Sequence, residues 1–249
     1  MRIHTYTLLR KGEGHPVFCE DYVLVQGLEE QWWVGAVMDG CSSGQDSHFA
    51  SALMGKLLRR ALRRARLDLE RFQTADDLHY YLLEMLFKDL RQTQRVLDLD
   101  LLELLSTLGL LIYHIPTQKA LLHFVGDGVM AVDGEIIEID QQNQPDYMAY
   151  HLDLDFKDWY QETGTQLYRF KAPRDLSIAT DGVMTFRSTQ AEATEALHPA
   201  TYLLTDQAMG NLENMLSRKF NILHKKYGYL PYDDVGIVRL HISDPEPQA

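Results

Sequence analysis

The chain has 249 residues, 45% of them hydrophobic and 24% charged, a composition typical of a globular protein with a hydrophobic core. A formal net charge of -12 argues against nucleic acid as a partner, because proteins that bind nucleic acid present a basic face to its phosphates. The two cysteines are too few for a disulfide framework, and the sequence has neither a signal peptide nor an apolar run of roughly 18 residues. We therefore expect a cytoplasmic protein with no membrane contact.

The N-terminal part of the chain predicts strands followed by long helices. From residue 47 to about residue 66, apolar side chains recur at helical spacing, and the opposite side is basic. That basic side is either a solvated helix face or a surface for an acidic partner. Thr74 and Asp77 predict a capping box at the start of a second amphipathic helix, which extends to Leu90. Before these helices, strands are predicted at residues 3–9, 22–25 and 32–38.

The remainder of the chain predicts an antiparallel meander, an excursion and a last helix. Asp133-Gly134 separates two short apolar runs, which is a strong signal for a two-residue hairpin. Residues 140–165 show no clear period and are interpreted as a surface excursion. A helix is predicted over residues 206–227. Further strands are predicted at residues 106–114, 120–125, 129–132, 135–139, 166–170, 176–180 and 235–242.

No internal repeat or linker divides the sequence. The order of strands, two helices, strands, one helix and a final strand is typical of a layered α+β domain, in which helices pack over antiparallel sheets. We therefore predict a single domain at residues 1–242, followed by a disordered tail at residues 243–249.

Acidic residues stand at the ends of four apolar strands. They are Glu20 and Asp21, Asp39, Asp181, and the adjacent pair Asp233 and Asp234. A carboxylate at the end of a buried strand is unfavourable unless a partner binds it, and Mg²⁺ and Mn²⁺ prefer such oxygen ligands. Two such ions can lower the pKa of a bridging water and present it to a phosphorus atom. These acids therefore predict a shared cation site and hydrolysis of a phosphate ester, although a single Asp-Gly pair is more often only a turn.

Six short motifs occur in the order found in one enzyme family. They are Cys19-Glu20-Asp21, Val37-Met38-Asp39-Gly40, Ser106-Thr107, Val125-Gly126-Asp127-Gly128, Ala179-Thr180-Asp181-Gly182-Val183 and Asp233-Asp234-Val235-Gly236-Ile237-Val238. Through them the chain resembles the metal-dependent protein serine/threonine phosphatases of type 2C, the PPM family, as a divergent member of bacterial type. The resemblance spans residues 3–242 and implies a four-layer αββα sandwich, in which pairs of helices flank two antiparallel β-sheets.

The resemblance also implies ligands for two Mn(II) or Mg(II) ions at one end of the sandwich. Asp39 resembles the acid that bridges both ions, and the carbonyl oxygen of Gly40 binds one of them. Asp181 and Asp233 resemble ligands of the other ion. Because Asp234 is adjacent to Asp233, it is the alternative ligand at that position.

Three further acids complete the implied site. Glu20 and Asp21 resemble an acidic pair at the second metal, one as a ligand and one through metal-bound water. Asp127 resembles a ligand of a third, weaker metal. In the implied mechanism the bridging water attacks phosphorus directly, without a phosphoenzyme intermediate, and Asp39 and Asp21 are the catalytic acids.

Several positions depart from the family pattern. Cys41 stands where some members carry a histidine proposed as the general acid. The arginine that usually grips phosphate is absent, which leaves Arg10, Lys11 and His15 as candidate substrate-binding residues. Thr185 stands where many members have a further acid, so a third metal is left open.

The leading interpretation is a protein serine/threonine phosphatase that hydrolyses phosphoserine and phosphothreonine through a metal-bridging water. Its partners would be a phosphorylated protein and the serine/threonine kinase system that it opposes, and we expect a monomer. Two alternatives remain open: a catalytically weak, phosphatase-like binding or regulatory protein, and a two-metal phosphoesterase of small molecules.

Overall fold

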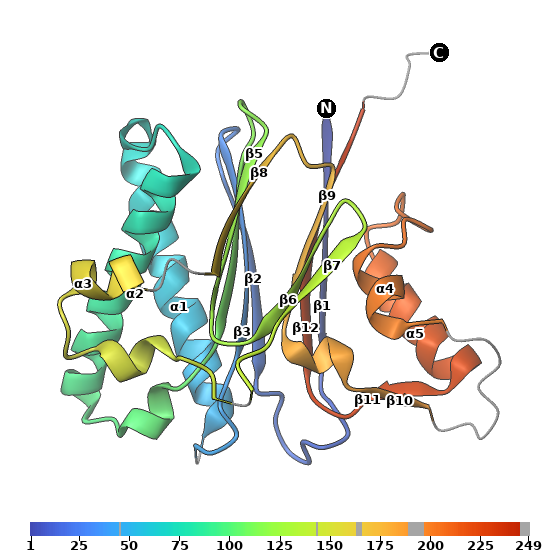
Figure 1. Ribbon diagram of the computed structural model, residues 1–249, viewed down its shortest axis with the longest axis horizontal. Helices are drawn as coiled ribbons and strands as arrows, with labels where there is room; N and C mark the ends of the chain where they lie inside the picture. The colour runs from blue at the N-terminus through green and yellow to red at the C-terminus, as the bar shows by residue number, and fades with distance from the viewer. Residues whose placement is uncertain (45, 143, 163–165, 189–196, 245–249) are drawn as a thin grey trace.

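Two five-stranded antiparallel β-sheets lie face to face in the computed structural model, and helices cover the outer face of each sheet (Figure 1). The structure describes residues 1–44, 46–142, 144–162, 166–188 and 197–244. The layers follow one another as helices, sheet, sheet and helices. This arrangement confirms the predicted α+β sandwich.

Both sheets contain strands from distant parts of the sequence. The first sheet has the order β1 (Arg2–Arg10), β12 (Val235–Ser243), β9 (Asp175–Ala179), β6 (Gly128–Val132) and β7 (Glu135–Ile139). The second has the order β2 (Asp21–Leu28), β3 (Trp32–Asp39), β4 (Leu108–His114), β5 (Lys119–Val125) and β8 (Leu167–Lys171). A small third sheet pairs β10 (Phe186–Ser188) with β11 (Tyr229–Pro231). Strand β12 includes the first residue of the predicted tail, and residues 245–249 lie outside the described residues.

Long helices cover the second sheet, and shorter ones cover the first. The helices α1 (Ser47–Ala65) and α2 (Ala75–Leu97) lie on the second sheet, whereas α4 (Pro199–Leu204) and α5 (Met215–Tyr227) lie on the first (Figure 1). The predicted capping box is present, because the Thr74 hydroxyl accepts a hydrogen bond from Asp77 N (3.2 Å) and the Asp77 carboxylate accepts one from Thr74 N (2.8 Å). Among the described residues, no helix is both long and apolar enough to cross a membrane.

The predicted Asp-Gly hairpin joins β6 to β7. Asp133 has φ of 49° and Gly134 has φ of 95°, as a two-residue turn with positive φ at both central residues requires. The carboxylate of Asp133 also accepts hydrogen bonds from Arg174 N (2.8 Å) and Asp175 N (2.9 Å), so the turn is tied to the start of β9.

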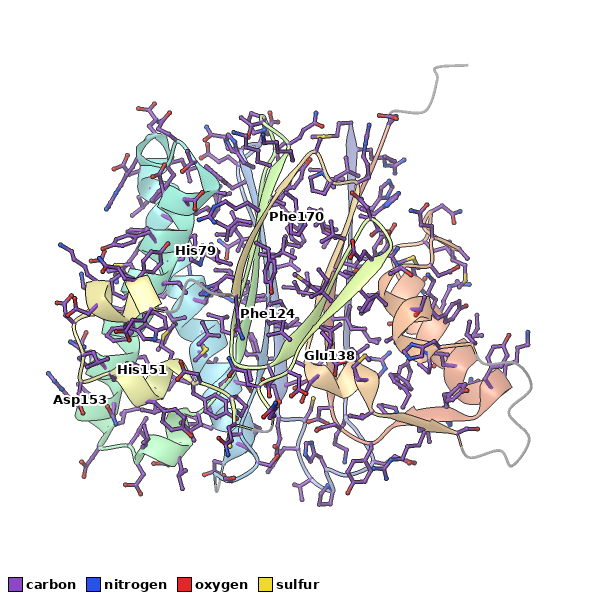
Figure 2. All side chains as sticks on the ribbon, in the orientation of Figure 1. His79, Phe124, Glu138, His151, Asp153 and Phe170 are labelled. Atoms are coloured by element: carbon purple, nitrogen blue, oxygen red, sulfur yellow. The ribbon has the colours of Figure 1, made fainter. Side chains whose placement is uncertain are left out.

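Apolar side chains fill the spaces between the layers. Phe124 and Phe170 belong to the core between the two sheets, and Figure 2 shows both among the side chains that fill this space. Leu58 and Leu86 belong to the core beneath α1 and α2, and Leu223 belongs to the core beneath α5. Full burial of one leucine side chain contributes about 1.5–3 kcal/mol, so these cores hold the four layers together.

The predicted helix over residues 206–227 is wrong in its N-terminal part. The helix α5 begins only at Met215, and the segment before it forms turns. Arg239 donates hydrogen bonds to the carbonyl oxygens of Thr205 (3.0 Å) and Asp206 (2.9 Å). These carbonyls are therefore satisfied by a distant side chain rather than by helical N–H groups. The short helix α4 was not predicted.

The predicted surface excursion at residues 140–165 is only partly correct, because its apolar residues Tyr147, Met148, Ala149, Leu152, Phe156 and Trp159 are buried, whereas most of its other described residues are exposed. It contains α3 (Phe156–Glu162) and packs on α2. Trp159 is 1% exposed and stacks on Phe87 with 5.2 Å between ring centroids. Scattered aromatic residues make these contacts, and scattered residues leave no period in the sequence.

A buried ion pair links two strands of the first sheet, and its arginine also holds the covering helices to that sheet. Arg239 on β12 donates to both carboxylate oxygens of Asp175 on β9, at 2.8 and 2.5 Å, and both side chains are buried. The guanidinium also donates to the carbonyl oxygen of Leu203 at 3.1 Å. These contacts fix α4 and the turn after it to the sheet.

Replacing Arg239 with Met should lower the free energy of unfolding by about 3–5 kcal/mol, because Asp175 would stay buried without its partner. Urea denaturation measures this loss. Arg174→Met is a matched control, because the ion pair between Arg174 and Asp244 is exposed and such pairs contribute about 1 kcal/mol or less. Equal destabilisation by the two changes would contradict the structural role of Arg239.

A buried histidine lies between α2 and the second sheet. Nδ1 of His79 is 2.9 Å from the Tyr160 hydroxyl oxygen, and Nε2 is 3.0 Å from Nδ1 of His123 (Figure 2). Burial is the largest cause that holds the pKa of His79 well below 6.5, and the charge of His123 acts in the same direction. His79 is therefore neutral in the folded protein.

Acidification should destabilise the fold through His79. Below pH 6.5 the unfolded chain binds a proton on this residue that the folded chain does not bind, so stability falls as the pH falls. The loss attributable to one such group is at most about 1.4 kcal/mol per pH unit. Urea unfolding at neutral and mildly acidic pH should show a smaller loss for His79→Gln than for the wild type. The exposed-site control His224→Gln should keep the wild-type loss, and equal pH dependence of all three proteins would refute the prediction.

Candidate metal centre

Acidic residues from both sheets come together at one end of the sandwich. Asp21 begins β2 and Asp39 ends β3, and the two are paired across the ladder. Asp181 follows β9, and Asp233 lies just before β12. Because β9 and β12 are antiparallel neighbours, the end of one lies beside the start of the other.

These carboxyl groups raise one another's pKa. Burial is the largest cause that raises the pKa of Asp39 well above 3.8, and the charge of Asp21 comes next. Burial also raises the pKa of Asp21 well above 3.8, although a hydrogen bond from Thr180 opposes the shift. Burial and the charge of Asp233 raise the pKa of Asp181 to about 6. A crowded, buried set of carboxylates of this kind is unfavourable in its ionised form unless a cation neutralises it.

One oxygen of this set has no partner. Oδ2 of Asp21 accepts a hydrogen bond from the Thr180 hydroxyl at 2.7 Å, whereas the buried Oδ1 has no hydrogen-bond partner. Within the part of the chain that the structure describes, no three His, Cys, Asp or Glu side chains are already arranged to hold a metal ion. The fit to a cation therefore rests on the oxygen donors, on their crowding and on this unpartnered atom.

The adjacent residues Asp233 and Asp234 have different surroundings. The buried Asp234 carboxylate accepts hydrogen bonds from Gly12 N (2.6 Å) and Glu20 N (2.5 Å). The Asp233 side chain is 37% exposed, and its charge acts on the pKa of Asp39. Asp233 is therefore the freer of the two to bind a cation, and Asp234 holds the loop between β1 and β2 against the start of β12.

His15 lies among the acids. Its Nδ1 is 2.9 Å from a carboxylate oxygen of Asp234, and its Nε2 is 3.7 Å from Glu20 and 3.6 Å from Asp233. Burial lowers the pKa of His15, but the neighbouring carboxylates, Asp234 above all and then Glu20 and Asp233, outweigh it and raise the pKa above 6.5. Of the three candidate substrate-binding residues, His15 is brought to the acids.

Arg10 and Lys11 make other contacts. The Arg10 guanidinium donates to the Ser217 hydroxyl on α5 at 3.3 Å and lies 5.4 Å from the centroid of the Phe220 ring. Lys11 Nζ donates to the carbonyl oxygen of Pro16 at 3.0 Å. None of these contacts involves an acid of the candidate centre, and a role for either residue in binding substrate stays a prediction.

Gly40 lies where α1 approaches the end of β3. A Cβ atom at this position would lie 1.9 Å from the carbonyl oxygen of Ser47, so a larger residue would force the backbone apart. Gly40 N donates to the carbonyl oxygen of Glu20 at 3.1 Å, and Asp39 N donates to the Thr107 hydroxyl at 3.0 Å. These bonds hold the end of β3 against both neighbouring segments.

Sequence reasoning missed two residues of the centre. The Thr180 hydroxyl, besides donating to Asp21, accepts a hydrogen bond from Gly236 N at 2.8 Å. Tyr147 comes from the predicted excursion, and its pKa is raised by burial first and then by the neighbouring Cys41 thiol. The position of Thr180 next to Asp181 was a usable signal, whereas no local pattern marks Tyr147.

Asp127 lies on the Asp181 side of the centre. Its charge contributes to the raised pKa of Asp181, and Oδ1 of Asp127 accepts a hydrogen bond from Gln141 N at 2.7 Å. Burial is the largest cause of the raised pKa of Asp127 itself. Its role at a third metal stays a prediction.

The sequence matches the model of a known family over most of its length. The family model for protein phosphatase 2C matches residues 13–217 of the chain. The chain belongs to the protein phosphatase 2C family. No curated protein matches its sequence.

Several solved structures share the fold at low sequence identity. The PP2C phosphatase domain of SpoIIE from Bacillus subtilis, solved with a fragment of its regulatory domain, is 14% identical with a TM-score of 0.60, covering 99% of this chain and 64% of that one. RsbX in complex with magnesium is 14% identical with a TM-score of 0.54, and the match covers 97% of this chain and 96% of the RsbX chain. The Mycobacterium tuberculosis serine/threonine phosphatase PstP is 13% identical with a TM-score of 0.56, and the match covers 97% of this chain and 99% of the PstP chain. This chain thus spans less than two thirds of the SpoIIE chain, and these likenesses concern the fold.

Asp39→Asn should raise the melting temperature of the metal-free PP2C domain, because it removes one charge from a crowded, buried set. A gain of about 1 kcal/mol corresponds to roughly 2–4 °C in a domain of this size. The same change should reduce the stabilisation produced by MnCl2, which binds the folded state. Thermal unfolding with EDTA and then with MnCl2 measures both effects. Asp153→Asn is the control, since Asp153 is exposed and lies away from the candidate centre (Figure 2). If MnCl2 stabilises Asp39→Asn as much as it stabilises the wild type, the result would count against the site.

Proposed function

We propose that this protein removes phosphate from phosphoserine and phosphothreonine residues of proteins, using two bound Mn(II) or Mg(II) ions. The observation that carries the proposal is the crowding of buried carboxyl groups at the strand ends of a PP2C-family sandwich. When bound, such ions lower the pKa of water and neutralise the charge of a phosphate group. Family membership implies a metal-dependent phosphatase, and the choice of phosphoserine and phosphothreonine is the finer part of the proposal.

Each acid has an assigned role in holding the ions. The proposed ligands are Asp21, Asp39, Asp181, Asp233, Glu20 and the carbonyl oxygen of Gly40, with Asp127 assigned to a third ion. Thr180 fixes one oxygen of Asp21 and leaves the other free for a cation. Ser42 donates to a carboxylate oxygen of Glu20 at 2.8 Å and orients that side chain.

His15 is assigned to the substrate phosphate. Its contacts with Asp234, Glu20 and Asp233 hold the imidazole at the edge of the acids, where the family's arginine is missing. The imidazole can donate a hydrogen bond to a phosphate oxygen, and its imidazolium form can donate from both ring nitrogens. Asp234 thus acts on the substrate indirectly, by positioning His15.

The proposed substrates are phosphoproteins made by a serine/threonine kinase of the same compartment. We place the protein in the cytoplasm as a monomer. The description of PstP as a serine/threonine phosphatase and the magnesium complex of RsbX support the reaction and the type of cofactor.

A phosphatase assay tests the proposal directly. Purified protein with MnCl2 should hydrolyse p-nitrophenyl phosphate and a phosphothreonine peptide, and EDTA should abolish both reactions. Asp39→Asn and Asp181→Asn should each lower kcat/KM by about 100-fold or more, because a metal contributes several kcal/mol of charge stabilisation. Asp153→Asn should leave the rate unchanged. A wild-type rate no higher than that of Asp39→Asn would refute the enzymatic function.

The second candidate function is a phosphatase-like protein that binds a partner without efficient catalysis. It is favoured by the missing arginine and by the direction of Arg10 toward α5. Calorimetric titration with MnCl2 separates the two functions, because a phosphatase should bind two ions per chain and the binding protein should bind none.

A phosphoesterase of small molecules is distinguished by a substrate panel in which phosphopeptides are the poorer substrates.

A further inference from the structure

We propose that a groove beside the candidate metal centre binds an apolar side chain next to the phosphorylated residue, so that the enzyme prefers phosphopeptides with leucine or phenylalanine at that position. The inference rests on the proposed phosphatase function. The groove has a volume of about 270 Å³ and lies between the loop of residues 15–18 and the first residues of α1, Ser47 and His48.

One wall of the groove, formed by Pro16, Val17 and Phe18, is apolar and exposed. Val17 is 69% exposed and Phe18 is 55% exposed, and Pro16 precedes them in the same loop. A single exposed apolar residue is ordinary, but two consecutive ones that line a groove form a surface suited to an apolar ligand group. The Phe18 ring stacks on His48 with 4.2 Å between ring centroids and an interplanar angle of 21°, so the wall has a defined shape.

The groove is continuous with the acids. Glu20 and His15 line it, and the same two side chains approach each other at 3.7 Å within the candidate centre. On the α1 side, Ser47 lines the groove and its carbonyl oxygen lies against Gly40, the residue that follows Asp39. The groove and the candidate centre therefore share the side chains of Glu20 and His15.

This continuity identifies the occupant as part of the substrate. An extended peptide advances by about 3.3 Å per residue, so a residue flanking the phosphorylated one can reach the groove while the phosphate is at the acids. The groove offers apolar contacts from Val17 and Phe18, and Glu20, His15 and His48 also line it. A polar flanking residue gains little from the apolar wall, whereas leucine or phenylalanine removes apolar surface from water there.

Matched phosphopeptides test the preference. One serine-flanked phosphothreonine peptide is compared with peptides that carry leucine immediately before or immediately after the phosphothreonine. The wild type with MnCl2 should show a kcat/KM about tenfold higher for one of the leucine peptides, as expected for filling an apolar pocket. Val17→Ser and Phe18→Ser should each bring this ratio close to one.

Leu67→Ser is the control variant, because Leu67 is 86% exposed and lies in the turn after α1, away from the groove. It should keep the wild-type ratio. The groove assignment is overturned if the wild type shows no leucine preference, or if both groove variants retain it. p-Nitrophenyl phosphate has no flanking residue, so its hydrolysis reports the phosphatase function without the groove. If the protein hydrolyses p-nitrophenyl phosphate but shows no leucine preference among the peptides, the groove assignment alone is overturned. Absence of this hydrolysis overturns the phosphatase function and the groove together.

Discussion

The central constraint in this structure is the mutual repulsion of carboxylates held together at the ends of buried strands. Burial removes water from Asp39 and Asp21, and each charge makes ionisation of the next less favourable. A fold that keeps such groups together gives up stability unless a cation neutralises them. The repulsion therefore connects the fold to the proposed chemistry, because a divalent cation relieves it and also neutralises a phosphate.

Hydrogen bonds between the two sheets keep the acids in place despite this repulsion. One hydroxyl, that of Thr180, bonds to Asp21 on the second sheet and to the backbone of Gly236 on the first. The Asp234 carboxylate bonds to the backbone of Gly12 and of Glu20, so the start of β12 holds the loop between β1 and β2. That loop carries both His15 and the apolar wall of the groove. The same carboxylate thus supports the candidate metal centre and the surface proposed to select substrates.

Much of the architecture follows from local patterns in the sequence. The period of α1, the capping box at Thr74 and the Asp133-Gly134 hairpin were predictable, because each depends on residues within a few positions of one another. The start of α5 and the burial of Trp159 were not, because Arg239 and Phe87, which decide them, are distant in sequence. Local propensity is overridden wherever such partners satisfy the backbone or cover an aromatic ring.

The sequence by itself determined which residue types were available: acids at four strand ends, a glycine after Asp39, and a histidine where an arginine was expected. The family resemblance favoured Asp233 over Asp234, but only the tertiary structure gave a physical reason, because their surroundings come from Gly12, Glu20 and His15 in another part of the chain. It also brought Thr180 to Asp21. The physical reason is that burial, charge and hydrogen bonding depend on neighbours in space, and β-sheet pairing makes neighbours of strands that are far apart in sequence.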